Sequence, residues 1–146
     1  MIKERFKIGT YVTVILRKGE DVLLIRRAKT GSYDGFYSLP GGGVDGNEPV
    51  TQAVAREALE EVGIKVKQED LKVVHVLHTM HKEKYETVGF FIEAKEWEGQ
   101  LQNMEPHKHD DLQWFPLNAL PENTIPHLRY VIDKINDGVF YSEFGW

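Results

Sequence analysis

Two runs of β-branched and aliphatic residues stand near the start of the chain. They cover residues 11–17 and 22–27, and they flank the short sequence Gly19-Glu20-Asp21. Runs of this kind are typical of β-strands, and a short glycine-containing segment between them is typical of a tight turn. The pattern predicts that a β-hairpin opens the domain.

Three more apolar runs predict strands further along the chain. Residues 71–80 and 85–94 are separated by a charged turn at 81–84, and a shorter run covers residues 112–115. After a proline-bounded loop, four apolar residues keep helical spacing: Ile125, Leu128, Ile132 and Ile135. Strands and helices alternate irregularly, which favours a mixed α/β sheet covered on both faces over a strict doubly wound fold.

The clearest helical pattern runs from about Pro49 to Val62. Asn47 or Glu48 is a candidate N-terminal cap, the proline suits a first helical turn, and Gly63 is a typical C-terminal stop. At about 100° per residue, five apolar residues share one arc of this helix and are expected to pack on the sheet. They are Val54, Ala55, Ala58, Leu59 and Val62.

The polar arc of the same helix carries Glu57, Glu60 and Glu61. Their i, i+3 and i+4 spacing lets them converge on one point. Like charges held together raise one another's pKa values and weaken a helix unless a cation compensates. Oxygen-only ligands select a hard cation, Mg2+ first and Mn2+ second, and Mg2+ is commonly shared with substrate phosphates. The pattern predicts metal-dependent hydrolysis at phosphorus, against the alternative of a merely solvated acidic face.

Arg56 lies within this acidic segment, between Glu48 and Glu60. Its spacing favours salt bridges that hold the acidic side chains in place over direct contact with substrate. We therefore include Arg56 in the catalytic set as a supporting residue.

A glycine-rich segment precedes the helix. Residues 30–35 read as a loop, and Leu39-Pro40 then leads into Gly41, Gly42 and Gly43. Backbone without side chains allows a ligand or another element to approach closely. We predict that these glycines form a wall of the site and that Gly42 contacts substrate.

The bulk composition narrows the function classes. The chain has 146 residues, a net charge of -5 and no cysteine, which suits one globular domain over residues 1–146 and excludes thiolate chemistry. The negative charge argues against bulk nucleic acid or membrane binding. No signal peptide or span of roughly 18 apolar residues is recognisable, so we expect a cytoplasmic protein, monomeric or homodimeric. The aromatic tail at 138–146, beyond a core at about 8–137, is expected to dock on the domain or on a partner.

From Gly42 to Ile64 the chain reads Gly-x5-Glu-x7-Arg-Glu-Ala-x-Glu-Glu-x-Gly-Ile. This segment resembles the Nudix box of the Nudix hydrolase superfamily, and every fixed position is matched. Ala58 is the one residue that differs from the usual pattern of the box, because a bulkier aliphatic residue is usual at this position. The flanking glycines, the opening hairpin and the closing helix extend the similarity to about residues 8–137.

The resemblance implies an α/β/α sandwich around a mixed sheet and hydrolysis of a nucleoside diphosphate linked to a group X, with Mg2+ or Mn2+. Carried over by position, it implies metal ligation by Glu57, Glu61 and the carbonyl of Gly41. Glu60 would ligate directly, ligate through water or help to deprotonate the nucleophile. The general base is left open, within the box or outside it.

Several subgroup signatures are absent, including the Ser-Gln-Pro-Trp-Pro-Phe-Pro stretch of NADH pyrophosphatases and the downstream proline or tyrosine of ADP-ribose and dinucleoside polyphosphate enzymes. The stretch Asn103-Met104-Glu105-Pro106-His107-Lys108, followed by Trp114, is instead similar to MutT-like nucleoside triphosphate pyrophosphatases. The resemblance thus implies hydrolysis of a (deoxy)nucleoside triphosphate to the monophosphate and pyrophosphate, with normal and oxidised nucleotides both open.

Four residues outside the box are candidate substrate contacts. Arg26 and Arg27 follow an apolar strand and are placed to neutralise phosphate oxygens. Phe36 is a candidate for stacking on a base, against the alternative of core packing. Glu105 is a candidate for reaching the metal or the base from a loop.

The histidines are left out of the site. Strand alternation places His78 opposite His75 and His81, which argues against a zinc site. His107 and His109 are expected to be solvent-exposed in a polar loop.

Three alternatives to a triphosphate pyrophosphatase were weighed. An ADP-ribose or CDP-alcohol pyrophosphatase would share the box, and a regulatory Nudix-fold domain would bind a nucleotide without cleaving it. Regulatory domains tend to have lost box carboxylates, whereas all are present here. Isopentenyl diphosphate isomerases share the fold but need a cysteine, which this chain lacks.

Overall fold

The computed structural model of the chain describes residues 3–146. The long strand β1 (Gly9–Lys18) is central, and it pairs in parallel with β6 (Glu86–Ala94) and antiparallel with the short strand β4 (Gly41–Gly43). Strand β5 (Lys72–Met80) continues the sheet beyond β6. The sheet is therefore mixed, as the sequence predicts.

The other end of the sheet is built on β2 (Asp21–Arg27). It pairs antiparallel with β3 (Tyr37–Ser38) and with β7 (His109–Pro116). The predicted hairpin is correct only at its tip, where Arg17 and Lys18 of β1 face β2. Beyond the tip the two strands separate, because β1 pairs with β4 and β6 while β2 pairs with β3 and β7.

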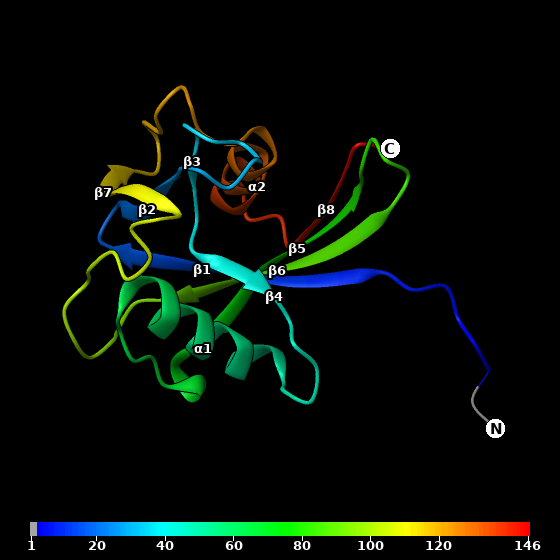
Figure 1. Cartoon of the computed structure of the whole chain (residues 1–146), viewed down its shortest axis with the longest axis horizontal. Helices are drawn as coiled ribbons and strands as arrows, with labels where there is room; N and C mark the ends of the chain where they lie inside the picture. Colours follow the sequence, from blue (N-terminus) through cyan, green and yellow to red (C-terminus); the bar gives the residue numbers. More distant parts are fainter. Residues whose placement is uncertain (1–2) are drawn as a thin grey trace.

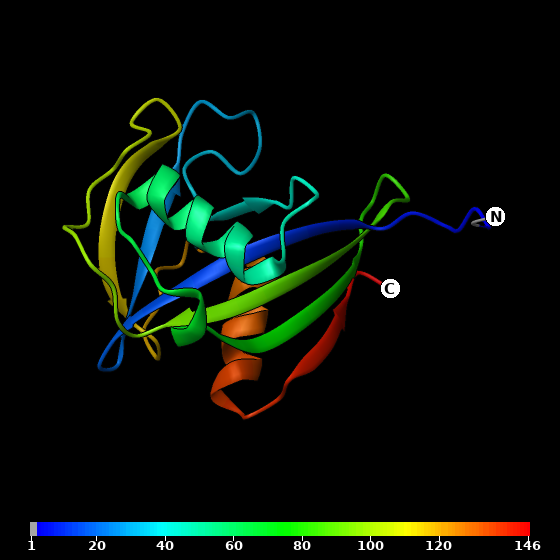
Figure 2. The same cartoon turned by 90° about the horizontal axis from the view of Figure 1, so that it is seen from below.

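Two helices cover opposite faces of the sheet, as Figures 1 and 2 show. Helix α1 (Val50–Val62) closes one hydrophobic cluster and α2 (Pro126–Asn136) closes the other, while η1 (Gln68–Asp70) is a short 3-10 turn. Side chains alternate across β1, so that Val14 lies in the α1 cluster and Ile15 in the α2 cluster. The predicted α/β/α sandwich is confirmed.

Helix α1 covers nearly the predicted residues, but its N-terminal cap and its packing face differ from the prediction. Pro49 occupies the capping position and makes no side-chain cap bond, so neither Asn47 nor Glu48 caps the helix. Gly63 ends it in the left-handed conformation, as predicted. Leu59, expected in the core, is 48% exposed.

The buried arc of α1 is rotated toward its acidic residues. Ala53, Val54, Glu57, Ala58 and Val62 are buried, and at about 100° per residue Leu59 points away from their centre. The prediction failed there because it treated Glu57 as part of a solvent face. Burial of Glu57 brings a carboxylate against the sheet.

The aromatic tail docks on the sheet, which is one of the two placements that the sequence left open. Strand β8 (Tyr141–Phe144) pairs in parallel with β5 along Val76–Thr79. No helix within residues 3–146 is long and apolar enough to span a membrane.

Candidate active site

The centre of the site is the contact between α1 and the glycines of β4. A side-chain Cβ added at Gly42 would lie 2.5 Å from Oε1 of Glu57, closer than any ordinary contact. Gly41 is equally constrained, because a Cβ there would lie 2.2 Å from the carbonyl oxygen of Val12. Gly42 therefore allows the helix to bring the carboxylate of Glu57 up to the strand, and Gly41 allows β4 to lie close against the backbone of β1.

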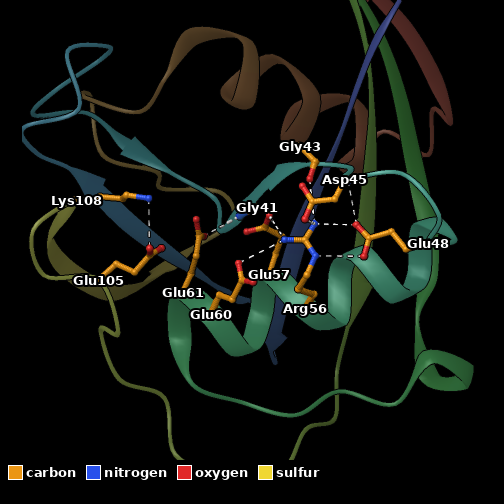
Figure 3. Close-up of polar contacts among 10 residues, drawn as sticks. All are labelled: Gly41, Gly43, Asp45, Glu48, Arg56, Glu57, Glu60, Glu61, Glu105 and Lys108. Atoms are coloured by element: carbon orange, nitrogen blue, oxygen red, sulfur yellow. Dashed lines mark hydrogen bonds and ion pairs between the residues drawn. The ribbon is translucent and has the colours of Figure 1, made fainter.

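Glu61 is attached to the same strand. The backbone N–H of Gly41 donates to Oε2 of Glu61 at 2.9 Å (Figure 3). Burial raises the pKa of Glu61 to about 8, and the charges of Glu57 and Glu105 push in the same direction. The hydrogen bond from Gly41 and the charge of Lys108 oppose this rise without overcoming it.

Arg56 carries the positive charge of this face. It donates twice to Glu48, from Nη2 to Oε1 at 2.8 Å and from Nε to Oε2 at 3.2 Å. Its Nη1 reaches Oε1 of Glu57 at 3.0 Å and Oε2 of Glu60 at 3.4 Å, and its Nη2 also donates to the Gly43 carbonyl oxygen at 3.1 Å. The salt bridges expected from the spacing of Arg56 are present (Figure 3).

The pKa values of the partners reflect this network. The hydrogen bonds from Arg56 lower the pKa of Glu48, and the pKa of Arg56 is raised in return. The pKa of Glu57 is raised, because the desolvation caused by burial outweighs the attraction of Arg56. Arg56 therefore neutralises the outer end of the acidic cluster, whereas Glu61 lies beyond its reach.

The three box carboxylates do not converge on one point in this structure. Glu57 and Glu61 lie along β4, whereas the side chain of Glu60 is 54% exposed and contacts Arg56. Within residues 3–146, no three acidic or histidine side chains stand close enough to hold an ion as they lie. The predicted convergence is wrong for this arrangement, because Arg56 draws two of the three carboxylates toward itself.

The donor set nevertheless suits a hard divalent cation. Glu57 is buried and Glu61 is half-buried, and desolvation raises the pKa of both, so no positive charge fully compensates their ionised forms. Oxygen donors without thiolates favour Mg2+ or Mn2+. Glu57, Glu61 and the Gly41 carbonyl are the groups that would hold the ion, and this ligation stays a prediction.

Glu105 lies on the Glu61 side of the site (Figure 3). Its carboxylate pairs with Lys108 at 3.3 Å, and its charge is one of those that raise the pKa of Glu61. The amide of Asn103 holds this loop, because it donates to the His109 carbonyl at 2.6 Å and accepts from the Glu105 N–H at 3.1 Å. The structure therefore places Glu105 near Glu61, and its contact with the metal or the base stays a prediction.

A pocket of about 760 Å3 opens in front of the glycine strand. Gly41, Gly42, Glu61 and Arg27 are among the residues that line it. Arg27 is held by Ser32, whose carbonyl accepts from its Nε at 2.7 Å. The pocket thus combines a carboxylate beside glycine backbone with the fixed guanidinium group of Arg27, and Lys82 and Lys84 also line it.

Two predicted substrate contacts lie elsewhere. Arg26 points away from the pocket and pairs with Asp110 at 2.6 Å, because neighbouring residues on a strand face opposite sides. Phe36 packs against the α2 cluster and makes an edge contact with Tyr33. Core packing, the alternative considered for Phe36, is what the structure shows.

His109 is a pocket residue that the sequence prediction missed. It begins β7 and is 4% exposed, instead of lying in an exposed loop. Burial lowers its pKa, and its Nδ1 has no hydrogen-bond partner within residues 3–146. Strand β7 starts at His109, three residues earlier than the predicted strand, and the polar sequence His109-Asp110-Asp111 carries no strand pattern that would have marked this start.

Comparison with known proteins agrees with this geometry. The NUDIX domain family model matches residues 7–135. An 8-oxo-dGTP diphosphatase from Proteus vulgaris is 33% identical over 100 residues, covering 67% of this chain and 85% of the relative. The chain belongs to the Nudix family.

Other relatives carry different names. An ADP-ribose pyrophosphatase from Methanocaldococcus jannaschii is 30% identical over 120 residues, covering 82% of this chain and 68% of the relative. The NAD-capped RNA hydrolase NudC from Chromobacterium violaceum is 28% identical over 137 residues, covering 90% of this chain. The chain spans only 49% of that NudC.

Solved structures support the same family. A MutT NUDIX hydrolase from Burkholderia pseudomallei has a TM-score of 0.79 and 29% sequence identity, covering 88% of this chain and 98% of that chain. This Nudix chain is therefore a pyrophosphohydrolase that acts on phosphoric anhydrides. Nudix hydrolases generally use divalent metal ions.

The raised pKa of Glu61 predicts how stability depends on pH. Between its ordinary value of 4.5 and its folded value of about 8, the folded chain keeps a proton that the unfolded chain has lost. The contribution of Glu61 to the free energy of unfolding therefore falls as the pH rises through this window. In EDTA, Glu61→Gln should remove much of that loss and be more stable than the wild type at pH 8 by on the order of a few kcal/mol.

Urea unfolding at pH 5 and pH 8 measures this difference. Glu60→Gln is the matched control, because Glu60 lies on the same helix with an exposed side chain. Its pH dependence should follow the wild type. A Glu61→Gln protein with the same loss between the two pH values as the wild type would contradict the assigned electrostatics.

Proposed function

We propose that this Nudix hydrolase cleaves (deoxy)nucleoside triphosphates to the monophosphate and pyrophosphate with Mg2+ as its metal, Mn2+ being a possible substitute. The observation that carries the proposal is the pocket, whose lining brings together the carboxylate of Glu61, bare glycine backbone and Arg27, with the buried carboxylate of Glu57 packed against Gly42. A chain of phosphates needs these groups together, since cations must offset its charge and backbone must approach it closely. The similarity to an 8-oxo-dGTP diphosphatase supports this choice and leaves oxidised nucleotides as candidates.

Each side chain has a defined part in the proposed reaction. Glu57, Glu61 and the carbonyl of Gly41 hold the metal, which when bound withdraws electrons from a phosphoryl oxygen and lowers the pKa of water. Arg27, which lines the same pocket as Gly41 and Glu61, neutralises phosphate oxygens. The backbone of Gly42 allows the phosphates to approach.

The proton and the leaving group must also be placed. Water forms a bond to phosphorus, the anhydride bond breaks, and pyrophosphate leaves with the electron pair of that bond. Glu60 or Glu105 is positioned to take the proton from the attacking water, since both carboxylates flank Glu61 (Figure 3). Arg56 does not touch substrate in this scheme and serves as a positioning residue for Glu57 and Glu60.

A nucleoside diphosphate linked to a sugar or an alcohol, as in ADP-ribose or a CDP-alcohol, is the alternative substrate class. It is favoured by the similarity to an ADP-ribose pyrophosphatase. Both classes use the same acidic end, and they differ only in the group attached beyond the phosphates. Substrate choice therefore has to be measured.

A panel assay decides between the two classes. It should contain canonical and 8-oxo triphosphates, ADP-ribose, NADH, dinucleoside polyphosphates and CDP-alcohols, each with Mg2+ and then with EDTA. We expect pyrophosphate release from triphosphates with Mg2+ and none with EDTA. Preference for ADP-ribose or a CDP-alcohol would overturn the triphosphate proposal, and no hydrolysis of any panel member would favour a binding-only domain.

The metal-ligand assignment has its own test. Glu61→Gln should lower turnover by roughly 100-fold or more, because it removes a ligand charge while the fold loses a source of repulsion. Glu96→Gln is the control, because Glu96 is an exposed glutamate outside the pocket. Steady-state rates and circular dichroism of both variants provide the readout, and undiminished turnover in folded Glu61→Gln would refute the assignment.

A further inference from the structure

The C-terminal tail is fixed to the sheet by a buried histidine. His75 is fully buried, and its Nδ1 lies 2.8 Å from the carbonyl oxygen of Val139. Its Nε2 lies 2.7 Å from the hydroxyl oxygen of Ser142. Both partners belong to the tail, so the buried imidazole of His75 holds β8 in place on the sheet.

The end of the tail is held at a second point. The indole N–H of Trp146 donates to the His78 carbonyl at 3.2 Å, and the two rings lie 4.8 Å apart. Between these anchors, Gly145 has a φ of +85°, and a Cβ there would lie 2.2 Å from the carbonyl oxygen of Met80. The chain therefore turns closely over the end of β5, where a larger residue would not fit.

This anchored tail forms part of the pocket that contains Glu61 and Arg27. Phe144 and Gly145 are among the residues that line it, next to Met80 and the loop at 81–85. The Phe144 ring lies 6.2 Å from His127 and 5.3 Å from Tyr130. Phe144 is thus supported from behind by α2 while it borders the pocket.

The pocket lining near Phe144 offers aromatic surface that suits a flat ring, while Lys82, Glu83 and Lys84 of the β5–β6 loop also line the pocket. His127 and Tyr33 line the pocket near Phe144, and burial lowers the pKa of His127 to about 4, so its imidazole is neutral at ordinary pH. The buried hydroxyl of Thr79 borders the same space and has no hydrogen-bond partner within residues 3–146. Aromatic surfaces with a few neutral polar groups are what a heterocyclic base needs.

We infer that the C-terminal tail is a specificity-determining wall of the substrate pocket and that Phe144 packs against the base of the nucleotide. This inference rests on the proposed function, because it assigns the nucleoside part of the same substrate. The phosphates lie at the glycine end, and the tail recognises what is attached to them.

Phe144→Ala tests the inference, with Phe140→Ala as the matched control. Both substitutions remove a phenyl ring from the tail, but Phe140 is 56% exposed and does not line the pocket. Stacking of a base on an aromatic side chain contributes to the free energy of substrate binding. Its loss in Phe144→Ala should raise KM about tenfold and change kcat less than about twofold. Phe140→Ala should match the wild type in both constants.

Product inhibition separates recognition of the base from a structural role. Phe144→Ala should weaken inhibition by the nucleoside monophosphate about tenfold and leave inhibition by inorganic pyrophosphate unchanged, because pyrophosphate has no base. Phe144→Leu, which keeps apolar volume against α2, should show the same contrast. Weaker inhibition by both products, or by neither, would overturn the inference.

The proposed function and this inference fail in different ways. If the wild type hydrolyses ADP-ribose or another panel member instead of triphosphates, the proposed substrate is wrong, and the same pair of variants is compared on that substrate. Equal KM values for Phe144→Ala and Phe140→Ala on whichever substrate the wild type hydrolyses would refute the role of the tail.

Discussion

The close approach of α1 to the glycine strand β4 is the constraint on which the rest of the site depends. The space that Gly42 leaves is occupied by the carboxylate of Glu57, and the N–H of Gly41 is bonded to Glu61. The side chain of Glu57 is thereby buried and that of Glu61 half-buried at the surface of the core, where ionisation is costly. A helix that packed further from the strand would leave these groups in water, with ordinary pKa values and little tendency to bind an ion.

The surrounding charges divide this acidic face into two parts. Arg56 compensates Glu48, Glu57 and Glu60, and it holds them through a fixed, planar set of donors. Glu61 is not among its partners, and its pKa remains raised to about 8. Glu61, which has no ion-pair contact with Arg56, lines the pocket. The proposed cation and the phosphates of the substrate would therefore meet beside this carboxylate.

The sequence predicted the parts of this molecule that depend on local pattern. Most strands, both helices and the Gly63 stop follow from periodicity and turn chemistry, and the box residues follow from their spacing. It did not predict features that depend on tertiary contacts. The rotation of α1 that exposes Leu59 follows from packing against β4, and the outward turn of Arg26 follows from the register of β2. The burial of His109 could not be predicted, because β7 begins in a stretch whose sequence resembles a polar loop.

Locating the ion tests the central claim most directly. Crystals grown with Mn2+ and a non-hydrolysable nucleoside triphosphate analogue would place the metal by its anomalous scattering. The account predicts a peak bound by Glu57, Glu61 and the Gly41 carbonyl, and shared with the phosphates in the pocket. A peak elsewhere, with Glu61 bonded only to the Gly41 N–H and the phosphates remote from α1, would contradict it.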